Sequence, residues 1–379
     1  MDVHSQIIET PELGDAEHAA IGKIAQIQTG LRHRTAEPRR WVGQMRRQAQ
    51  AAAIRGSNSI EGYVVTVEDA AAVVAGGATS EDTVAIEAVR SYQRAMTYVL
   101  QAARDPHFEY STGLLKVIHF ITTEFDLDAH PGLIRPGDIY IVNATTGQAE
   151  YAGPDAELAT PLTDALCRHL NSATGEPMID AAMAHLNLVK IHPFKDGNGR
   201  MSRILQTLVL ARSGTLVPEF ASIEEYLGAH TQSYYGILRT VGGPEWASNL
   251  DARDWIRYCL NAHHIQATVL TRRLAEAEEL WGILESAASD ATAHDRSVAV
   301  LHDALMGHRV RNSSYIESVK SATGNQIGKQ TATNDLRVLV DAGLLYSRGA
   351  NRGAHYVASD RLLGLRRVQP AKPLVDLFD

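Results

Sequence analysis

The sequence predicts a mainly α-helical protein of two to three domains. Its 379 residues exceed one domain, at about 150 residues per domain. Alanine is abundant while aromatic residues make up only 6%, a balance that favours packed helices over a β-sandwich. With 45% hydrophobic and 21% charged residues, the composition is that of a folded chain, which excludes collagen-like, low-complexity and largely disordered classes.

Apolar spacing, prolines and glycines predict the individual elements. The helices expected before the C-terminal part are two within 15–53, interrupted near Pro38, then 80–104, one from Ser111, 155–173, 180–191, one carrying Met201, Ile204, Leu205, Leu208 and Ala211, and 251–284. Pro193 ends the helix before it, because a residue that precedes proline is pushed away from the α region. Gly214 is the expected C-terminal stop of the helix that starts near Met201.

One stretch departs from the helical pattern. Residues 131–154 contain β-favouring residues around a turn-like Asn-Ala-Thr-Thr-Gly, which predicts a β-hairpin inside the helical protein. Its simplest interpretation is an edge hairpin that covers the core.

Cysteine content and the N-terminus predict the compartment. Cys167 and Cys259 are too few for a disulfide framework or a zinc cluster. Residues 1–20 lack the basic and apolar regions of a signal peptide, and no run of 18 apolar residues occurs. We therefore expect a cytoplasmic protein that does not span a membrane.

The net charge of −8 is unevenly distributed. Residues 296–367 carry eleven Lys or Arg and five Asp or Glu, a balance of +6, so the rest of the chain carries −14. A small basic domain is expected after a linker of small polar residues at 287–294. The overall charge argues against a surface that coats nucleic acid, but not against one basic module.

The strongest functional signal is the segment 191–203, IHPFKDGNGRMSR, where one helix ends and another starts. Its glycines permit close backbone approach to a ligand, and the N-terminus of the following helix attracts anions. Arg200 and Arg203 lie three residues apart and are expected to face one anion, a phosphate. Asp196 suits Mg²⁺ bridging to phosphate oxygens, and His192 suits proton abstraction near neutral pH.

A Gly-Asn-Gly stretch alone is most often a tight connection between helices, but the full set matches the signature HxFx(D/E)GNGRxxR over 192–203. The chain thus resembles the Fic (filamentation induced by cAMP) family, whose usual activity transfers AMP from ATP to a protein hydroxyl. The resemblance implies His192 as general base and Asp196 as Mg²⁺ ligand. It implies a nucleotide site made of Phe194, Gly197, Asn198, Gly199, Arg200 and Arg203, in which Phe194 fixes the loop by packing into the core. Position 199 is Gly, as in adenylylating members, whereas the kinase-like Doc branch has Lys.

Two further features gain a role from the resemblance. The hairpin corresponds to a flap that aligns the target backbone by strand addition, through Ile139, Tyr140 and Ile141. Tyr234 and Tyr235 resemble paired tyrosines that line the nucleotide pocket or pack beside it.

Ser57-Asn58-Ser59-Ile60-Glu61-Gly62 resembles the inhibitory motif (S/T)xxxE(G/N) of the subclass with an N-terminal inhibitory helix. A helix that ends at Gly62 would present Glu61 to Arg203 and keep that arginine from the γ-phosphate, with Ser57 holding the helix or the glutamate in place. A surface helix terminus is the alternative interpretation.

The C-terminal pattern of helix, helix, turn, helix and two short strands resembles a winged helix-turn-helix. Its expected DNA contacts are Lys329, Thr331, Thr333, Asn334 and Arg337 on the recognition helix, and Arg348 and Arg352 on the wing. Such modules also serve protein interaction or dimerisation, so DNA, a protein partner and a homodimer stay open.

The expected organisation is an N-terminal helical region (1–105) with the inhibitory motif at 57–62, a Fic catalytic core (106–286) and a winged-helix domain with its tail (287–379). The expected function is a protein adenylyltransferase that uses ATP and Mg²⁺, modifies a target protein or itself, and is inhibited by Glu61. The alternative is a DNA-binding transcriptional regulator whose Fic core binds nucleotide or modifies itself. A reverse, AMP-removing activity also stays open.

Overall fold

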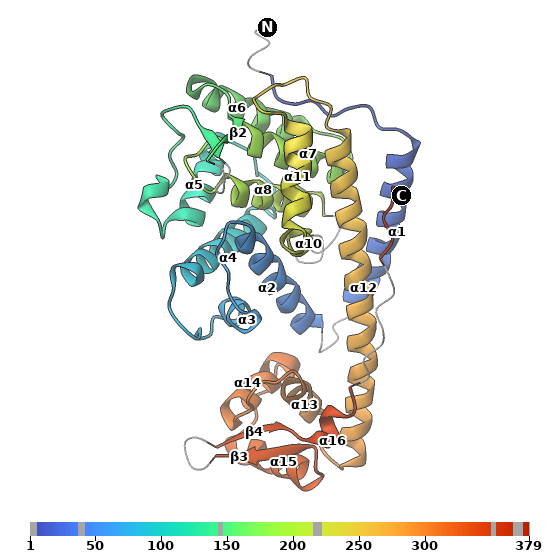
Figure 1. Cartoon of the computed structure of the whole chain (residues 1–379). Coiled ribbons are helices and arrows are strands. Elements are labelled where there is room, and N and C mark those ends of the chain that lie inside the picture. Colours follow the sequence, from blue (N-terminus) through green and yellow to red (C-terminus); the bar gives the residue numbers. More distant parts are fainter. Residues whose placement is uncertain are drawn as a thin grey trace. The chain divides into compact units, whose positions relative to one another are not determined.

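The computed structural model describes residues 6–36, 42–142, 147–214, 222–349, 354–366 and 374–378. It confirms the expected mainly helical class (Figure 1). The chain divides into two compact units, one of residues 1–34, 46–269 and 374–379 and the other of residues 35–45 and 270–373. Among the described helices, none is long and apolar enough to cross a membrane.

The elements before the second unit are predominantly helical. They are α1 (Asp15–Ala36), α2 (Val42–Ile60), α3 (Val67–Ala75), α4 (Val84–Ala102), α5 (Thr112–Thr123), the 3₁₀ turn η2 (Leu127–Ala129), β1 (Tyr140–Val142), β2 (Ala149–Ala152), α6 (Ala156–Ser172), α7 (Pro177–Ile191), α8 (Asn198–Ser213), α10 (Glu224–Ala229), α11 (Thr231–Gly242) and α12 (Arg253–Asp290). The end of α1, the start of α2 and the later part of α12 belong to the second unit.

The core of the first unit is built on α7 and α8, which pack against each other. Thirteen of the fifteen residues of α7 and twelve of the sixteen of α8 are buried, so neither helix has a solvent face. Gly214 ends α8 in the left-handed conformation, as expected. His192 ends α7, also in the left-handed region at φ 50°, which turns the chain sharply into the loop 193–197.

Helix α2 is fitted closely against α10 through two glycines. A Cβ at Gly56 would lie 2.5 Å from the carbonyl oxygen of Glu224, and a Cβ at Gly228 would lie 2.5 Å from the Cα of Gly56. Only glycine lets the two backbones approach this far. This contact fixes the position from which the C-terminal end of α2 reaches the loop after α7.

The expected hairpin is present as β1 and β2, paired antiparallel with Ile141 opposite Tyr151 and an irregularity after Ile141. The other side of β2 is covered, because Ala152 exchanges backbone hydrogen bonds with Pro244 and Trp246. All three residues of β1 are exposed. Strand β1 is therefore the open edge of the hairpin within the described residues.

The second unit contains η3 (Asp295–Ser297), α13 (Val298–Leu305), α14 (Asn312–Thr323), α15 (Lys329–Asp341), β3 (Leu345–Arg348), β4 (His355–Ala358) and α16 (Asp360–Leu363). Strands β3 and β4 form an antiparallel hairpin with Leu345 opposite Ala358. Arg296 binds both carboxylate oxygens of Asp335 at 2.7 and 3.0 Å, and the Tyr315 hydroxyl donates to the same carboxylate. This partly buried network ties η3 and α14 to α15.

The linker expected at 287–294 is shorter than the sequence suggested. Helix α12 continues to Asp290, because Ala287 and Ala288 are buried and alanine extends a helix at no cost. Composition alone does not distinguish a run of small residues in a linker from the same run on a packed helix face.

The substitution Gly56→Ala tests the close fit of α2 on α10. Its Cβ meets backbone atoms that cannot move aside, so we expect a loss of about 1–3 kcal/mol in the free energy of unfolding, measured in urea. Gly236→Ala in α11 is the matched control, since a Cβ there meets nothing within 4 Å and should stabilise by up to about 1 kcal/mol. A Gly56→Ala variant as stable as the wild type would contradict the close contact.

Candidate active site

The loop between α7 and α8 is held by side chains that bind its main chain. Phe194 N–H donates to Asn198 Oδ1 at 3.0 Å, and Asn198 Nδ2 donates back to Phe194 O at 2.8 Å. The Phe194 ring is fully buried and stacks on His119, with ring centroids 3.8 Å apart. The packing role expected for Phe194 is thus what the structure describes, while Asn198 acts on the loop backbone.

His119, on α5, bridges two loops in a defined tautomer. Gly132 N–H donates to its Nδ1 at 2.9 Å, so Nε2 carries the proton and donates to Asp196 O, also at 2.9 Å. Burial lowers the pKa of His119 to about 4, which keeps the ring neutral at physiological pH.

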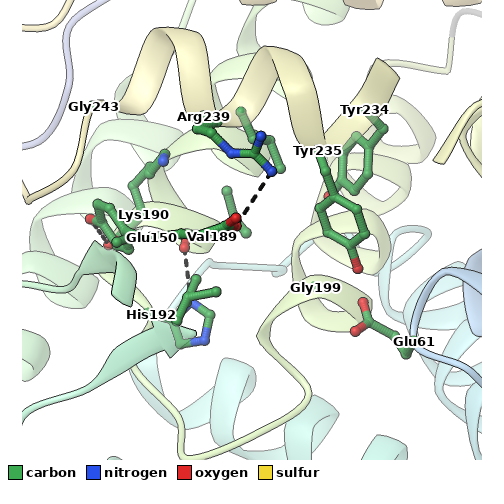
Figure 2. A pocket seen from close by; sticks show the side chains of 13 residues that line it. Glu61, Glu150, Val189, Lys190, His192, Gly199, Tyr234, Tyr235, Arg239 and Gly243 are labelled. Carbon is green, nitrogen blue, oxygen red and sulfur yellow. Dashed lines mark hydrogen bonds and ion pairs between the residues drawn. The ribbon is translucent and has the colours of Figure 1, made fainter. Parts of the chain in front are cut away.

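His192 is oriented by its own helix. Its Nδ1 lies 3.0 Å from Val189 O, an acceptor only, so Nδ1 carries the proton and Nε2 keeps its lone pair. Its carbonyl oxygen accepts from Nε of Arg135 at 2.9 Å, and burial lowers the pKa of the imidazole. His192 is therefore a neutral base that lines a cavity of about 260 Å³ (Figure 2).

The cavity gathers residues from six segments of the first unit. It is lined by Glu61, Ile141, Glu150, Tyr151, Val189, Lys190, His192, Gly199, Tyr234, Tyr235, Leu238, Arg239 and Gly243. The paired tyrosines are among them, but they differ. Tyr234 is buried and its hydroxyl lies 2.9 Å from His185 Nε2, whereas Tyr235 is partly exposed and donates to Ile60 O at 3.1 Å.

Arg203 is almost fully buried at 1% exposure and makes four hydrogen bonds to three residues. Its Nη2 lies 2.7 Å from Glu61 Oε1 and also donates to Ser57 O, while Nε donates to Ser57 Oγ at 2.7 Å. Nη1 lies 3.5 Å from the Tyr234 hydroxyl. Burial works against the charged guanidinium, but the Glu61 carboxylate offsets it and leaves the pKa of Arg203 above its ordinary value.

The pairing expected between Glu61 and Arg203 is therefore present, with a different role for Ser57. Ser57 binds Arg203 rather than Glu61. Gly62, at φ 85°, follows the end of α2 and turns the chain away, which leaves Glu61 over the first turn of α8. A Cβ at Gly199 would overlap with the Glu61 carboxylate, so glycine at 199 makes this close approach feasible.

Arg200 and Arg203 do not face the same neighbours. The Arg200 guanidinium lies 5.0 Å from the Tyr63 ring and 5.5 Å from the Phe125 ring, and its Nη2 is 4.0 Å from Asp196 Oδ2. Asp196 is more than half exposed and accepts the Gly197 N–H at 2.6 Å. No group of three or more His, Cys, Asp or Glu side chains that could hold a metal occurs within the described residues.

In the second unit, the residues expected to contact DNA lie on one helix and one hairpin. Lys329, Asn334 and Arg337 are exposed on α15, and Arg348 is exposed on β3. Thr331 is half-buried, and Thr333 is exposed but accepts from Asn312 Nδ2 at 2.6 Å. Arg352 lies outside the described residues.

Three groups that hold the site are marked by no motif in the sequence. Arg135 binds His192 O, Gly137 O and Pro154 O, which joins the loop to the segments that flank the hairpin. His119 fixes Asp196, and His185 connects Gln206 Oε1 to the Tyr234 hydroxyl. None belongs to a local motif, since each binds at least one residue more than 20 positions away, so no spacing signal marks them.

Two buried neutral histidines predict how stability depends on pH. Burial lowers the pKa of His119 to about 4 and that of His185 to about 3, whereas both titrate near 6.5 in the unfolded chain. The unfolded state thus binds more protons, and the free energy of unfolding should fall as the pH drops from 6.5 towards 4. Urea unfolding at several pH values gives the slope of the free energy of unfolding against pH. In His119→Gln this slope should decrease by up to about 1.4 kcal/mol per pH unit, which corresponds to the uptake of one proton. An unchanged slope would show that His119 is not buried as a neutral ring.

A family model and curated relatives that match the chain all carry the name Fic. Residues 109–210 match the Fic/DOC family model. The chain is 30% identical over 172 residues to protein adenylyltransferase fic-1 of Caenorhabditis elegans, covering 44% of this chain and 30% of that protein. It is 54% identical over 91 residues to protein adenylyltransferase Fic of Drosophila melanogaster, covering 23% of this chain and 15% of that protein. The chain spans less than a third of the length of these curated relatives.

Solved structures agree in fold. A Fic family protein from Desulfovibrio desulfuricans G20 superposes with a TM-score of 0.61 at 20% identity, covering 93% of this chain and 98% of that chain. Fic-1 from C. elegans superposes with a TM-score of 0.54 at 20% identity, covering 68% of this chain and 72% of that chain. The matched residues 109–210 include the loop 193–197, His192 and both arginines, and they form a Fic/DOC family domain.

Proposed function

We propose that the protein is an adenylyltransferase that moves AMP from ATP to a hydroxyl group of a target protein or of itself, and that Glu61 inhibits it. One observation carries the proposal: the neutral His192 lines the same cavity as Glu61 and Gly199, and Gly199 lies in the first turn of α8, where an anion would bind. The similarity to relatives named protein adenylyltransferase supports the same reaction.

The chemistry follows from the positions of the groups. The N-terminus of α8 and Arg203 attract the β- and γ-phosphates, and Gly197 and Gly199 leave room for them. His192 Nε2 takes the proton of the target hydroxyl, whose oxygen attacks the α-phosphorus. The bond from that phosphorus to the bridging oxygen breaks and pyrophosphate leaves. Because the imidazole is already neutral, no proton has to be removed before it acts as base.

Asp196 is the group suited to Mg²⁺. Its carboxylate is the exposed acid of the loop, and magnesium in phosphate-transfer sites binds one or two carboxylates with phosphate oxygens and water. The ion would neutralise phosphate charge. Gly197 N–H binds one carboxylate oxygen, and the other lies 4.0 Å from Arg200 Nη2, so this second oxygen would have to turn from the arginine to bind the metal.

The open edge of β1 suits a peptide substrate. Tyr140 and Ile141 are exposed, Ile141 lines the cavity, and β1 has no strand on its outer side within the described residues. A target segment added to this edge would bring its hydroxyl side chain towards His192. Ile139, whose carbonyl oxygen binds Gly153 N–H, would hold the start of the flap.

Glu61 competes with the phosphates for the same positive groups. Its carboxylate is 2.7 Å from Arg203 and lies against Gly199, where the terminal phosphate would have to sit. ATP then binds only if the carboxylate moves or the phosphate takes another pose. The same carboxylate faces the cavity, so removal of AMP from a modified target by a water molecule is the second reaction that this site supports.

Glu61→Gly is the direct test of inhibition. Removing the carboxylate frees Arg203 for phosphate. Labelling of lysate proteins by ATP tagged on the α-phosphate should therefore rise roughly tenfold or more, since a change of about 1.4 kcal/mol in the activation barrier, the size of one ion pair, is tenfold in rate. Mass spectrometry of the labelled proteins would identify the target. The matched controls are Glu61→Gln, which keeps the size and removes the charge, and His192→Ala added to Glu61→Gly, which should abolish labelling. Equal labelling by wild type and Glu61→Gly would refute inhibition by Glu61.

A second function, DNA binding by a C-terminal winged helix-turn-helix, is favoured by the exposed side of α15. Lys329, Asn334 and Arg337 lie at spacings of five and three residues and are exposed, with the β3–β4 hairpin following as a wing. The surrounding residues 296–367 carry a charge of +6, the sign that phosphate binding requires.

For this second function, Arg337→Ala should weaken duplex DNA binding and lower the slope of log affinity against log salt by about one. Fluorescence anisotropy at 50 to 200 mM salt measures both quantities. His192→Ala serves as the control with an unchanged slope. Binding that is absent, or insensitive to salt in the wild type, would leave protein interaction as the role of the module.

A further inference from the structure

Lys190 is a buried cation in the cavity that the proposed reaction does not use. It lies in the last turn of α7, two residues before His192, and is only 5% exposed. Figure 2 shows Lys190 and Gly243 at one end of the cavity, with Glu61 and Gly199 at the other. The lysine thus lies at the end opposite to the proposed phosphate site.

The ammonium group is placed by an aromatic ring and a glycine. Its Nζ lies 4.2 Å from the centroid of the Tyr151 ring, and the Tyr151 hydroxyl donates to Lys190 O at 2.6 Å. A Cβ at Gly242 would overlap with Nζ and Cε of Lys190, so the lysine fills the space that a side chain at 242 would take. The Tyr151 ring and the space beside Gly242 therefore define one location for the charge.

No carboxylate neutralises this charge in the part of the chain that the structure describes. Of the two acids that line the cavity, Glu150 is paired with Arg239 at 3.3 Å and Glu61 with Arg203 at 2.7 Å. A buried ammonium without an acceptor is costly. Burial lowers the pKa of Lys190 to about 8, so the group is still mainly charged at neutral pH and offers only donors. The occupant of this end of the cavity should supply an acceptor.

We propose that Lys190 donates a hydrogen bond to a ring nitrogen of the adenine of ATP and so sets affinity and base preference. The inference rests on the proposed function, because phosphates at the α8 end direct the base towards the opposite end of the cavity. Adenine offers acceptors only at its ring nitrogens, since its exocyclic amino group donates. The alternative is that Lys190 only holds β2 against α7 through Tyr151.

Lys190→Met separates the two roles, because methionine keeps the length and the apolar contact but cannot donate. Calorimetry in the Glu61→Gly background measures affinity for ATP and for ribose 5′-triphosphate, which has no base. Loss of one hydrogen bond to a charged group should weaken ATP roughly tenfold or more and leave ribose 5′-triphosphate unchanged. An equal loss for both ligands, or no loss for ATP, would overturn the proposal.

Analogues of ATP identify the acceptor. Each of 1-deaza-, 3-deaza- and 7-deaza-ATP lacks one ring nitrogen. One of them should bind the protein that retains Lys190 as weakly as ATP binds Lys190→Met, and the affinity of that analogue should not fall further in Lys190→Met. If all three lose affinity in Lys190→Met as much as ATP does, the lysine does not contact a ring nitrogen.

Gly242→Ala provides a second variant that keeps the lysine. Its methyl group displaces the flexible tip of Lys190 rather than backbone, so ATP should bind more weakly while the thermal unfolding temperature stays within a few degrees of the wild type. The failures of the two proposals can be told apart. If ATP binding depends on the base but no AMP is transferred to any protein, the proposed transferase activity is refuted and the role of Lys190 stands. If AMP is transferred but affinity does not depend on the base, the role of Lys190 is refuted and the transferase activity stands.

Discussion

The burial of Arg203 is the constraint on which the site depends. A guanidinium that is 1% exposed is tolerable only with acceptors around it, and here they come from Ser57, Glu61 and Tyr234. Two of these lie on the end of α2, so the same charge that is proposed to bind phosphate also fixes the segment proposed to block it. Inhibition and catalysis would thus share one cation, and a phosphate group must replace Glu61 without leaving that cation unpaired.

The second constraint is the main chain of the loop 193–197. Pro193, Phe194 and Gly197 are buried, whereas Lys195 and Asp196 are exposed, and the buried main-chain groups need partners within the protein. His119, Asn198 and Arg135 supply the missing partners for Asp196, Phe194 and His192. The result is a loop with little freedom, which aims the free nitrogen of His192 at the cavity and leaves the Asp196 carboxylate outside, accessible to an ion.

The cavity has opposite chemistry at its two ends. One end holds Gly199, in the first turn of α8, and the Glu61 carboxylate that pairs with Arg203, and the other holds the buried ammonium of Lys190 beside a tyrosine ring. An elongated ligand with an anionic end and an aromatic, acceptor-bearing end satisfies both, and a nucleoside triphosphate has this form. The open strand β1 beside the cavity adds a place for a polypeptide.

The sequence by itself determined the helical class, the hairpin at 131–154, the helix boundaries at Pro193 and Gly214, and the run from His192 to Arg203 that chemistry and family resemblance both single out. These features are local, since caps, turns and a contiguous motif are written in neighbouring residues. Only the tertiary structure decided which partners complete the site. The partners that complete the site, Arg135, His119 and His185, bind residues distant in sequence, and Lys190 occupies space that is open only because residue 242 is glycine. Helices α7 and α8 are buried on every side, so their polar residues follow no amphipathic period. Contacts of this kind depend on how helices pack in three dimensions, and no spacing along the chain encodes them.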